Sequence, residues 1–296
     1  MKRLIVNADD FGLTPGVNRA IVELHKRGLL TSATLMARAP ATEDAIALAL
    51  STPTLGVGCH VVLVDGEPVL SPREQIPWLA DPIAGRFRPT LGAFLDWLYV
   101  RSPKARMSEQ IEAEAAAQIR LLQSRGLRLT HIDTHKHTHM FPAVLRPVLR
   151  AARAAGIRAV RNPFEPAWSI RATPGASWLR RKQVQLLRML EPTFLRIVAE
   201  EGLVTTDGGI GVLATGTLNQ PTLMSLLPAI PDGIWELVTH PGYHDNDLAQ
   251  AHTHLQASRE VEFEALRALD GHASLPLVQF GNLLDGPAES SSTKEG

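Results

Sequence analysis

The stretch HIDTHKHTHM, residues 131–140, places four histidines and one aspartate within nine residues. Imidazole and carboxylate groups bind divalent metals and transfer protons near neutral pH. The residues from Leu129 to Asp133 are typical of a buried strand, and we expect the remainder to be a loop that folds over a site. A solvated histidine-rich surface loop is the alternative interpretation, so the rest of the chain must decide between the two.

The composition narrows the class of protein. The chain has 296 residues, of which 45% are hydrophobic, which is enough for a sizeable core in one domain or two. A formal net charge of zero argues against a nucleic-acid-binding protein. The one cysteine, Cys59, excludes an internal disulfide and fits a reducing cytoplasm. The sequence shows neither a signal-peptide pattern nor an apolar run of about eighteen residues, so we expect a cytoplasmic protein.

Strand and helix patterns alternate along the chain. Apolar runs predict strands at 4–8, 33–37, 55–64, 129–133, 157–161 and 234–238. Helical periodicity predicts helices at 17–27, 42–50, 108–125, 142–155, from 220, and at 248–268. This alternation favours a mainly parallel sheet with helical crossovers. With no internal repeat and no linker, we predict one domain over residues 1–285 and a disordered tail over 286–296.

Two segments interrupt the alternation. Residues 68–103 hold several prolines and aromatic residues with one short helix at 91–100, and we interpret them as a candidate lid. Residues 168–199 combine six basic residues with one acid, Glu191, among apolar side chains. Such a basic amphipathic segment either packs on the sheet as an ordinary helix or lies on an anionic membrane face or apolar tail.

Polar residues recur where the predicted strands end, and this regularity indicates the fold. They are Asp9 and Asp10, His60, Asp133 and His135, Arg161, and His240. The C-terminal face of a (β/α) barrel is where such enzymes build their sites. We therefore predict an α/β fold of the (β/α) barrel type, a TIM-barrel variant with irregular or incomplete closure.

These residue types point to a metal centre. Asp9 and Asp10 cannot face the same way in an extended chain, so one could bind a metal while the other takes a proton. His60 and His135 add two imidazoles from other strand ends, although each alone could be a hydrogen-bonded core histidine. Three protein ligands with an open position are typical of a catalytic metal. Asp133 could then orient a ligand ring.

Other catalytic devices are weaker candidates. His240 precedes a proline after a late strand and is either a general acid or a turn histidine. The sequence has no G-x-S-x-G elbow, Cys59 lies in an apolar run typical of inert core, and the glycines at 208–211 lack a dinucleotide-binding context.

Four motifs resemble the YdjC-like carbohydrate deacetylases. They are IVNADDFG at 5–12, GCH at 58–60, HIDTHKHTHMFP at 131–142 and HPG at 240–242. The similarity extends to about Gly271, and within the family the sequence is most similar to the hopanoid-biosynthesis deacetylases (HpnK).

The resemblance implies a metal-dependent N-deacetylase on a (β/α)-barrel-like fold. It implies Asp10, His60 and His135 as metal ligands and Asp9 as the base that activates the attacking water. His240 would be the general acid by analogy with polysaccharide deacetylases. Arg161 would orient Asp9 or the sugar. His137 and His139 also match the family pattern, and we expect them to support the loop.

The resemblance also implies a cofactor and a substrate. Two imidazoles and a carboxylate favour zinc, and a site completed by water would also suit magnesium. The substrate would be an N-acetylhexosamine that releases acetate, and for the hopanoid members it would be lipid-linked, as acetylglucosaminyl bacteriohopanetetrol, with contact at the inner membrane face. The sequence predicts no oligomeric state.

Three alternatives stay open. The first is a chitooligosaccharide deacetylase, which shares the chemistry. The second is another metal-dependent hydrolase, such as a phosphoesterase, for which only Lys136 and Arg161 supply nearby positive charge. The third is a non-catalytic module that binds lipid or sugar, and that interpretation would tolerate loss of Asp9.

Overall fold

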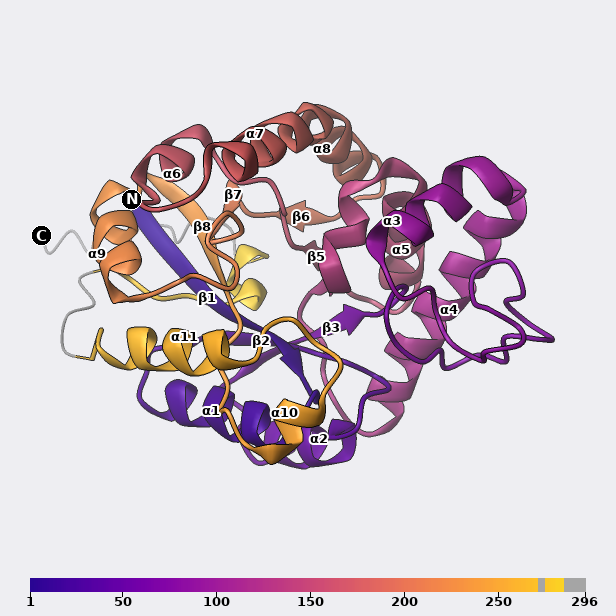
Figure 1. Ribbon diagram of the computed structural model, residues 1–296, viewed down its shortest axis with the longest axis horizontal. Helices are drawn as coiled ribbons and strands as arrows, with labels where there is room; N and C mark the ends of the chain where they lie inside the picture. The colour runs from indigo at the N-terminus through magenta and orange to yellow at the C-terminus, as the bar shows by residue number, and fades with distance from the viewer. Residues whose placement is uncertain (271–274, 285–296) are drawn as a thin grey trace, which may run out of the picture.

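The computed structural model describes residues 1–270 and 275–284, so the predicted tail lies outside the described residues. Its parallel strands form one sheet in the order β6-β5-β4-β3-β2-β1-β8-β7, which curls into a barrel surrounded by helices (Figure 1). The predicted (β/α) barrel is therefore confirmed. The strands are β1 (Lys2–Phe11), β2 (Ser32–Leu35), β3 (Gly56–Val61), β4 (Ile132–Thr134), β5 (Ala159–Val160), β6 (Val204–Thr205), β7 (Gly208–Ile210) and β8 (Gly233–Thr239).

Helices cover the outside of this barrel. Around β1 to β5 they are α1 (Pro15–Lys26), α2 (Thr42–Leu50), α3 (Leu91–Asp96), α4 (Lys104–Ser124) and α5 (Pro142–Ala154). The later helices are α6 (Ala167–Ala172), α7 (Trp178–Leu187), α8 (Glu191–Glu200), α9 (Gln220–Ala229), α10 (Asn246–Gln250) and α11 (Ala257–Arg267). Short turns of helix complete the set: η1 (Trp97–Arg101), η2 (His135–Met140), η3 (Arg188–Leu190) and η4 (Phe280–Leu283).

The barrel closes irregularly, as predicted, between β6 and β7. These two edge strands are consecutive pieces of one segment, because only Thr206 and Asp207 separate them. β6 pairs with β5 and β7 pairs with β8, so the segment links both edges of the sheet. The Gly209 N–H donates across the seam to the Phe164 carbonyl at 3.3 Å. A side chain at Gly209 would put its Cβ 2.7 Å from the Asn162 carbonyl oxygen, so the close approach requires glycine.

The barrel interior changes from apolar to polar along its axis. Near the N-terminal ends of the strands, Ile5, Ala159 and Phe280 form a small buried cluster. The imidazole of His131 stacks on Phe280, with ring centroids 3.8 Å apart. Toward the other end, Asn7 and later polar residues face inward, whereas Leu4, Val6 and Ala8 belong to the main core under the helices. The strand alternation of β1 thus separates a packing face from a polar face.

The predicted helix over 248–268 is wrong. The chain forms α10 and α11 with an irregular segment, residues 251–256, between them. Asp245 starts α10 early, because its side chain accepts from the Leu248 N–H at 3.0 Å as an N-cap. The Thr253 hydroxyl then accepts from the Leu255 N–H, a local bond that competes with helix.

The two unusual segments differ in how they pack. Residues 68–103 lie beside α4 at the right of Figure 1, and the buried Glu114 carboxylate accepts from the Val69 and Leu70 N–H groups. Residues 168–199 form α6, α7, η3 and α8. Phe194 of α8 is buried, but α7 buries none of its residues. No helix in the described part of the chain is long and apolar enough to span a membrane.

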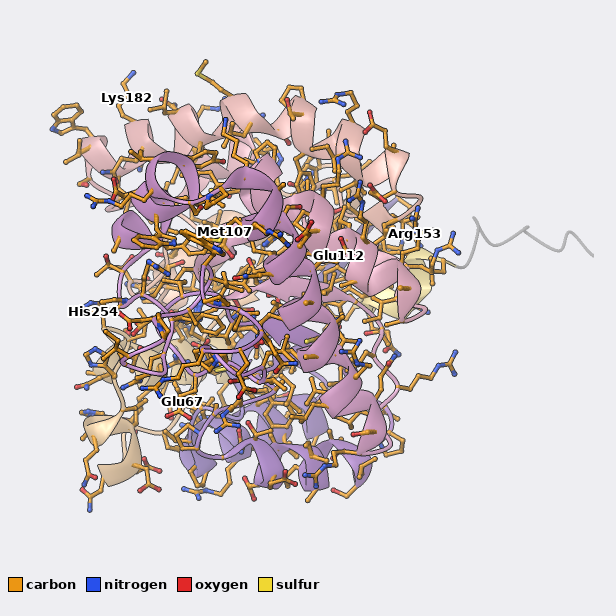
Figure 2. All side chains as sticks on the ribbon, turned by 90° about the vertical axis from the view of Figure 1, so that its right-hand side faces the viewer. Glu67, Met107, Glu112, Arg153, Lys182 and His254 are labelled. Atoms are coloured by element: carbon orange, nitrogen blue, oxygen red, sulfur yellow. The ribbon has the colours of Figure 1, made fainter. Side chains whose placement is uncertain are left out.

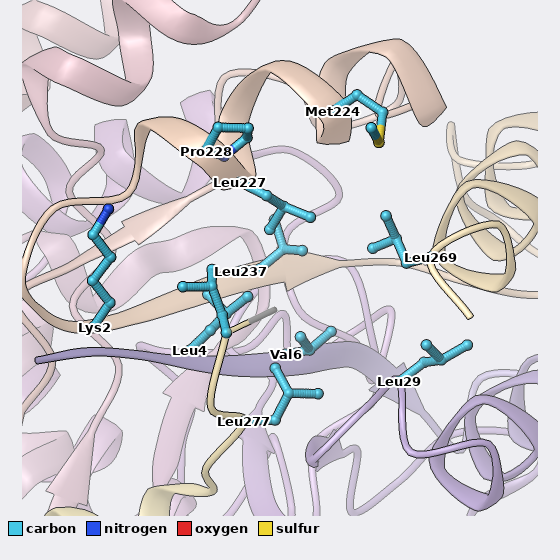
Figure 3. A pocket seen from close by; sticks show the side chains of 11 residues that line it. Lys2, Leu4, Val6, Leu29, Met224, Leu227, Pro228, Leu237, Leu269 and Leu277 are labelled. Carbon is cyan, nitrogen blue, oxygen red and sulfur yellow. The ribbon is translucent and has the colours of Figure 1, made fainter. Parts of the chain in front are cut away.

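A cavity of about 400 Å³ lies outside the barrel, away from the polar end (Figure 3). Its walls come from β1, β8, α9 and the segment after α11, and they include Leu4, Leu237 and Leu227. None of the predicted site residues lines it.

Candidate metal and catalytic site

Both aspartates at the end of β1 reach the same pocket, which simple strand alternation does not allow. The register of β1 against β2 shifts between Ala8 and Phe11, and Asp10 adopts a left-handed conformation with φ of 62°. Aspartate tolerates this region better than most residues, and such outliers cluster at functional sites. The bulge turns the Asp10 side chain toward the pocket that Asp9 already faces.

Three side chains converge at the mouth of the barrel. Asp10 Oδ1 lies 3.4 Å from His60 Nε2 and 3.2 Å from His135 Nδ1. His60 Nε2 and His135 Nδ1 are 3.3 Å apart. These atoms come from the ends of β1, β3 and β4, which neighbour one another in the sheet through β2. They form a group that could hold one metal ion.

The chemistry of this group fits a divalent cation. Asp10 Oδ1 is buried and has no hydrogen-bond partner in the described structure. His60 Nδ1 lies 2.8 Å from Asp133 Oδ1, which fixes the ring and presents the Nε2 lone pair to the other two ligand atoms. Burial alone would lower the pKa of His60, but Asp133 and Asp10 raise it to about 10. The surroundings therefore favour positive charge at this position.

Asp9, His60 and Asp133 form a second group within ligand reach of one another. Both carboxylates of this group already pair with Arg161, at 2.6 Å for Asp9 and 2.5 Å for Asp133. Their lone pairs are therefore less available than those of Asp10.

Arg161, which follows β5, is fully buried and forms a bidentate ion pair with Asp9. Its Nη1 and Nη2 donate to Asp9 Oδ2 and Oδ1 at 2.7 and 2.6 Å, and its Nε donates to Glu236 Oε1 at 2.7 Å. Burial would raise the pKa of Asp9, but the Arg161 charge holds it well below its usual range. Asp9 is therefore ionised and oriented, and Arg161 has no exposed surface with which to touch a substrate.

His240 lies at the end of β8 beside Asp9. Its Nε2 is 3.7 Å from Asp9 Oδ2, and Glu262 Oε2 lies 3.8 Å from its Nδ1 and accepts from its backbone N–H at 2.6 Å. Burial would lower the pKa of His240, but the negative charge of Glu262, with Asp9 and Asp10, raises it. The surroundings of the ring thus favour its protonated form.

The other histidines of the opening motif lie in different surroundings. His131 faces the barrel interior, where its Nε2 is 3.2 Å from Asn7 Oδ1 and Asn7 in turn donates to Asp9. His139 is buried against the Thr134 hydroxyl. His137 borders the pocket with a left-handed backbone (φ 51°), and burial lowers its pKa to about 3. Its buried Nδ1 has no hydrogen-bond partner among the described residues. This nitrogen is therefore available to bond a ligand in the pocket.

The pocket above these groups has a volume of about 260 Å³. Asp9, Asp10, His60, His135 and His240 line its floor. Segment 251–256 between α10 and α11 forms part of its wall, as do Arg180 of α7 and residues after β7. The structure thus gathers the predicted site residues at one opening, except Arg161, Asp133 and His139, which are buried behind it.

Comparison with known proteins identifies the family of the chain. A family model described as YdjC-like protein matches residues 3–273. The chain belongs to the YdjC-like family. A relative from Brevibacillus brevis named carbohydrate deacetylase is 34% identical over 269 residues, 90% of this chain and 92% of the relative. One of the same name from Thermoanaerobacter pseudethanolicus is 30% identical over 284 residues, 96% and 97% of the two chains.

A solved structure from Enterococcus faecalis, described as a proposed cellobiose-phosphate cleavage protein, has the same fold. It superposes with a TM-score of 0.73 at 27% identity and covers 95% of this chain and 98% of its own. The predictions of family and fold are confirmed. The narrower similarity of this YdjC-like protein to the hopanoid-biosynthesis deacetylases stays a prediction.

Sequence analysis missed two charged residues of the YdjC-like protein that lie one helical turn apart on α11. Arg259 is fully buried, and its Nη2 donates to Asp10 Oδ2 at 2.5 Å. Glu262 is the partner of His240 described above. Nothing local marks them, since α11 is far along the chain from Asp10. Their spacing of three residues puts both on one face of the helix, but the burial that distinguishes them from surface charges cannot be read from the sequence.

We expect Asp133→Asn to weaken metal binding by about tenfold to a hundredfold, because the residue orients His60 from behind. The measurement is the dissociation constant for zinc by chelator competition. Glu165→Gln is the matched control, since it alters a buried carboxylate that bonds Ser169 and Leu213 instead of the site. Equal zinc affinity in wild type and Asp133→Asn would show that Asp133 does not support metal binding.

Proposed function

We propose that this protein is a metal-dependent N-deacetylase that cleaves the acetamide of an N-acetylhexosamine and releases acetate. That the chain is a carbohydrate deacetylase, and so an amide hydrolase, follows from the family match and from relatives of that name over most of its length. The observation that carries the metal-dependent mechanism is the convergence of Asp10, His60 and His135 beside Asp9, which is paired with Arg161, and His240.

Asp10, His60 and His135 would hold the metal, and the two imidazoles with one carboxylate favour zinc over magnesium. A divalent metal bound there supplies a lowered pKa for water and polarisation of the acetamide carbonyl. The remaining groups of the chain move protons. Metal binding would use the imidazole lone pairs of His60 and His135, so neither ring would serve as acid or base.

In the proposed reaction Asp9 takes the proton of the attacking water and His240 gives one to the departing nitrogen. Arg161 keeps Asp9 ionised but also makes it a weak base. A proton that Asp9 accepts is therefore held weakly and is readily transferred to another group. His240 Nε2, 3.7 Å from Asp9 Oδ2, is placed to receive it after protonating the nitrogen. The carbon–nitrogen bond breaks, and the products are acetate and a protonated amino sugar.

We further propose a lipid-linked substrate, such as a hopanoid glycolipid, met at a membrane surface. The support is the exposed side of α7 and η3: Trp178, Leu186 and Met189 are 74%, 66% and 74% exposed. Lys182 projects outward from α7 (Figure 2), and this helix has no acidic residue. Arg180, on the opposite side of the same helix, lines the pocket, so α7 itself borders the site. Anionic lipid suits that combination.

A phosphoester substrate fits the site less well. Anionic phosphate wants uncommitted cations or helix N-termini close to the metal. Arg161 and Arg259 are both committed to Asp9 and Asp10, and Lys136 Nζ pairs with Asp65 at 2.7 Å. These three cations are therefore committed to carboxylates, which suits a neutral amide better than an anionic phosphate.

We expect Asp9→Asn to lower acetate release by about a hundredfold to ten-thousandfold while zinc content stays equal to wild type, because the base is lost and the ligands remain. Acetate is measured with acetylglucosaminyl hopanoid in detergent and with di-N-acetylchitobiose, using metal-stripped and metal-restored protein. Release should require the metal.

The control for this variant is Asp96→Asn, which changes an exposed carboxylate of α3 outside the pocket. A non-catalytic binding module would show no release from wild type and the same ligand affinity in both variants. Acetate release from the chitobiose alone would support the proposed deacetylation and contradict the lipid-linked substrate.

We expect Glu262→Gln to shift the alkaline loss of kcat to lower pH by about one unit. The general acid must be protonated, so activity falls as pH rises through the pKa of His240. Glu262 raises that pKa, and its removal lowers it. The pH profile of kcat and the NMR titration of His240 measure the shift. Glu260→Gln, an exposed change on the same helix, should leave both curves in place. Coincident curves for Glu262→Gln and wild type would remove Glu262 from this role.

We expect Trp178→Ala combined with Leu186→Ala to reduce binding to phosphatidylglycerol vesicles about tenfold or more, since both side chains would leave the lipid interface. Vesicle co-sedimentation measures the bound fraction. The control combines Ile83→Ala with Met224→Ala, two exposed apolar residues (91% and 53%) on other elements. Equal binding by the two double variants, or no binding by wild type, would argue against a membrane-facing α7.

A further inference from the structure

The cavity outside the barrel has the size of a binding site and is separate from the metal site (Figure 3). Its volume of about 400 Å³ lies within the range of cavities that hold small organic ligands. It shares no lining residue with the pocket over Asp10 and His60. The barrel wall separates the two, because Leu4 and Val6 of β1 point outward into the cavity whereas Asn7 faces the barrel interior.

The floor of this cavity is apolar. Leu4, Val6 and Leu237 are buried and lie along it. β1 and β8 are hydrogen-bonded to each other over this length, so the sheet presents side chains and few free polar groups. Met224 of α9 is 53% exposed at the edge, so the cavity can be reached from solvent. A sugar would lose its hydration here without new hydrogen bonds, whereas a hydrocarbon chain would gain apolar contacts.

The remainder of this sequence offers no side chain suited to fill the cavity. The residues outside the described part are GHAS at 271–274 and DGPAESSSTKEG at 285–296. Neither stretch contains Leu, Ile, Val, Met, Phe, Tyr or Trp. An apolar ligand from outside the chain is therefore the better occupant.

Lys2 gives one end of the cavity a positive charge. Figure 3 shows its side chain extending from the start of β1 toward the side of α9. No described residue forms an ion pair or hydrogen bond with its ammonium group. The Asp232 carboxylate, next to the Gly233 that pairs with Lys2 in the sheet, binds the terminal amino group of Met1 at 3.2 Å. A cation beside an apolar floor complements an anionic head on an apolar chain.

We propose that this cavity binds a straight-chain carboxylate, with its hydrocarbon chain along Leu4 and Leu237 and its head at Lys2. One ammonium group suits a singly charged head. A phosphate head would favour further cations or a helix N-terminus, and the described lining residues include neither. The site is independent of the proposed deacetylase function, because it lies on the other side of the barrel wall.

The first test is calorimetric titration of the metal-loaded protein with hexanoate, octanoate and decanoate. Each pair of added methylene groups should lower the dissociation constant about tenfold, because they are buried on binding. Octyltrimethylammonium, with the same chain and the opposite charge, should bind about tenfold more weakly than octanoate. No binding, no dependence on chain length, or equal affinity for the two octyl compounds would overturn the proposal.

The metal site needs a control of its own, since a carboxylate can also bind a metal ion. Metal-stripped protein should bind octanoate with the same affinity as metal-loaded protein. Loss of binding with the metal would place octanoate at Asp10, His60 and His135 and would overturn the cavity site.

A variant at Lys2 separates the head from the chain. Lys2→Met keeps an apolar stem and removes the charge, so it should weaken octanoate binding about fivefold and leave octanol binding unchanged. Lys26→Met is the matched control, since Lys26 is an exposed residue of α1 outside the cavity. Equal octanoate affinity in the two variants would overturn the assigned head position.

A variant at Leu227 tests the chain. Leu227→Trp adds bulk inside the cavity and should weaken octanoate and octanol alike by about tenfold or more. Leu50→Trp, at an exposed position of α2, is the matched control and should bind both as wild type does. Unchanged affinity in a folded Leu227→Trp protein would overturn the site.

Methyl NMR of the wild-type protein locates the ligand even where that variant does not fold. Octanoate should shift the methyl signals of Leu4 and Leu237. Shifts confined to Leu179 and Leu186 would place the ligand on the exposed face of α7 and overturn the proposal. Sedimentation velocity tests a second copy of the chain as the occupant: a dimer that octanoate leaves intact, with the signals of Leu4 and Leu237 unmoved, would assign the cavity to that interface instead.

Discussion

The structure depends on one buried cation, Arg161. A guanidinium without solvent contact is strongly unfavourable unless it is paired and hydrogen-bonded. Here it contacts Asp9, Asp133 and Glu236, which come from β1, β4 and β8. The ends of strands from different parts of the barrel are therefore held in register by one side chain. Three carboxylates around one cation leave an excess of negative charge. Burial raises the pKa of Glu236 to about 7, so partial protonation of this carboxyl group reduces that excess.

Asp133 couples this network to the metal ligands. Its Oδ2 contacts Arg161 and its Oδ1 holds the His60 ring, so the group that orients Asp9 also orients a ligand. On the opposite side, α11 reaches Asp10 through Arg259 and His240 through Glu262. Two groups of residues thus position the site: the Arg161 network inside the barrel, and Arg259 and Glu262 of α11 outside it. Both work by fixing side chains before a substrate arrives, and such preorganisation is the main source of electrostatic catalysis.

The sequence predicted much of this arrangement because polar residues at strand ends follow from local pattern alone. It could not predict that Asp10 turns into the pocket, since the bulge depends on the register with β2. It also grouped four histidines that the structure separates. Of these, His135 joins the ligand group, His131 faces the barrel interior, and His139 packs behind the loop. The contacts of α11 with Asp10 and His240 could not be predicted, because no local pattern shows which residues distant in sequence meet in the fold.

Chemistry and substrate choice occupy different parts of the molecule. The groups that would hold the metal and move protons are buried at strand ends, where each has several fixed partners. The groups that would contact a lipid-linked substrate beyond the reacting sugar lie on α7 with exposed side chains, as Trp178 and Leu186 show. Exposed loop residues can change with little cost in stability, whereas a change in the Arg161 network leaves a buried charge unpaired. Exposed residues around the pocket, such as those of α7, can therefore vary while the buried site stays the same.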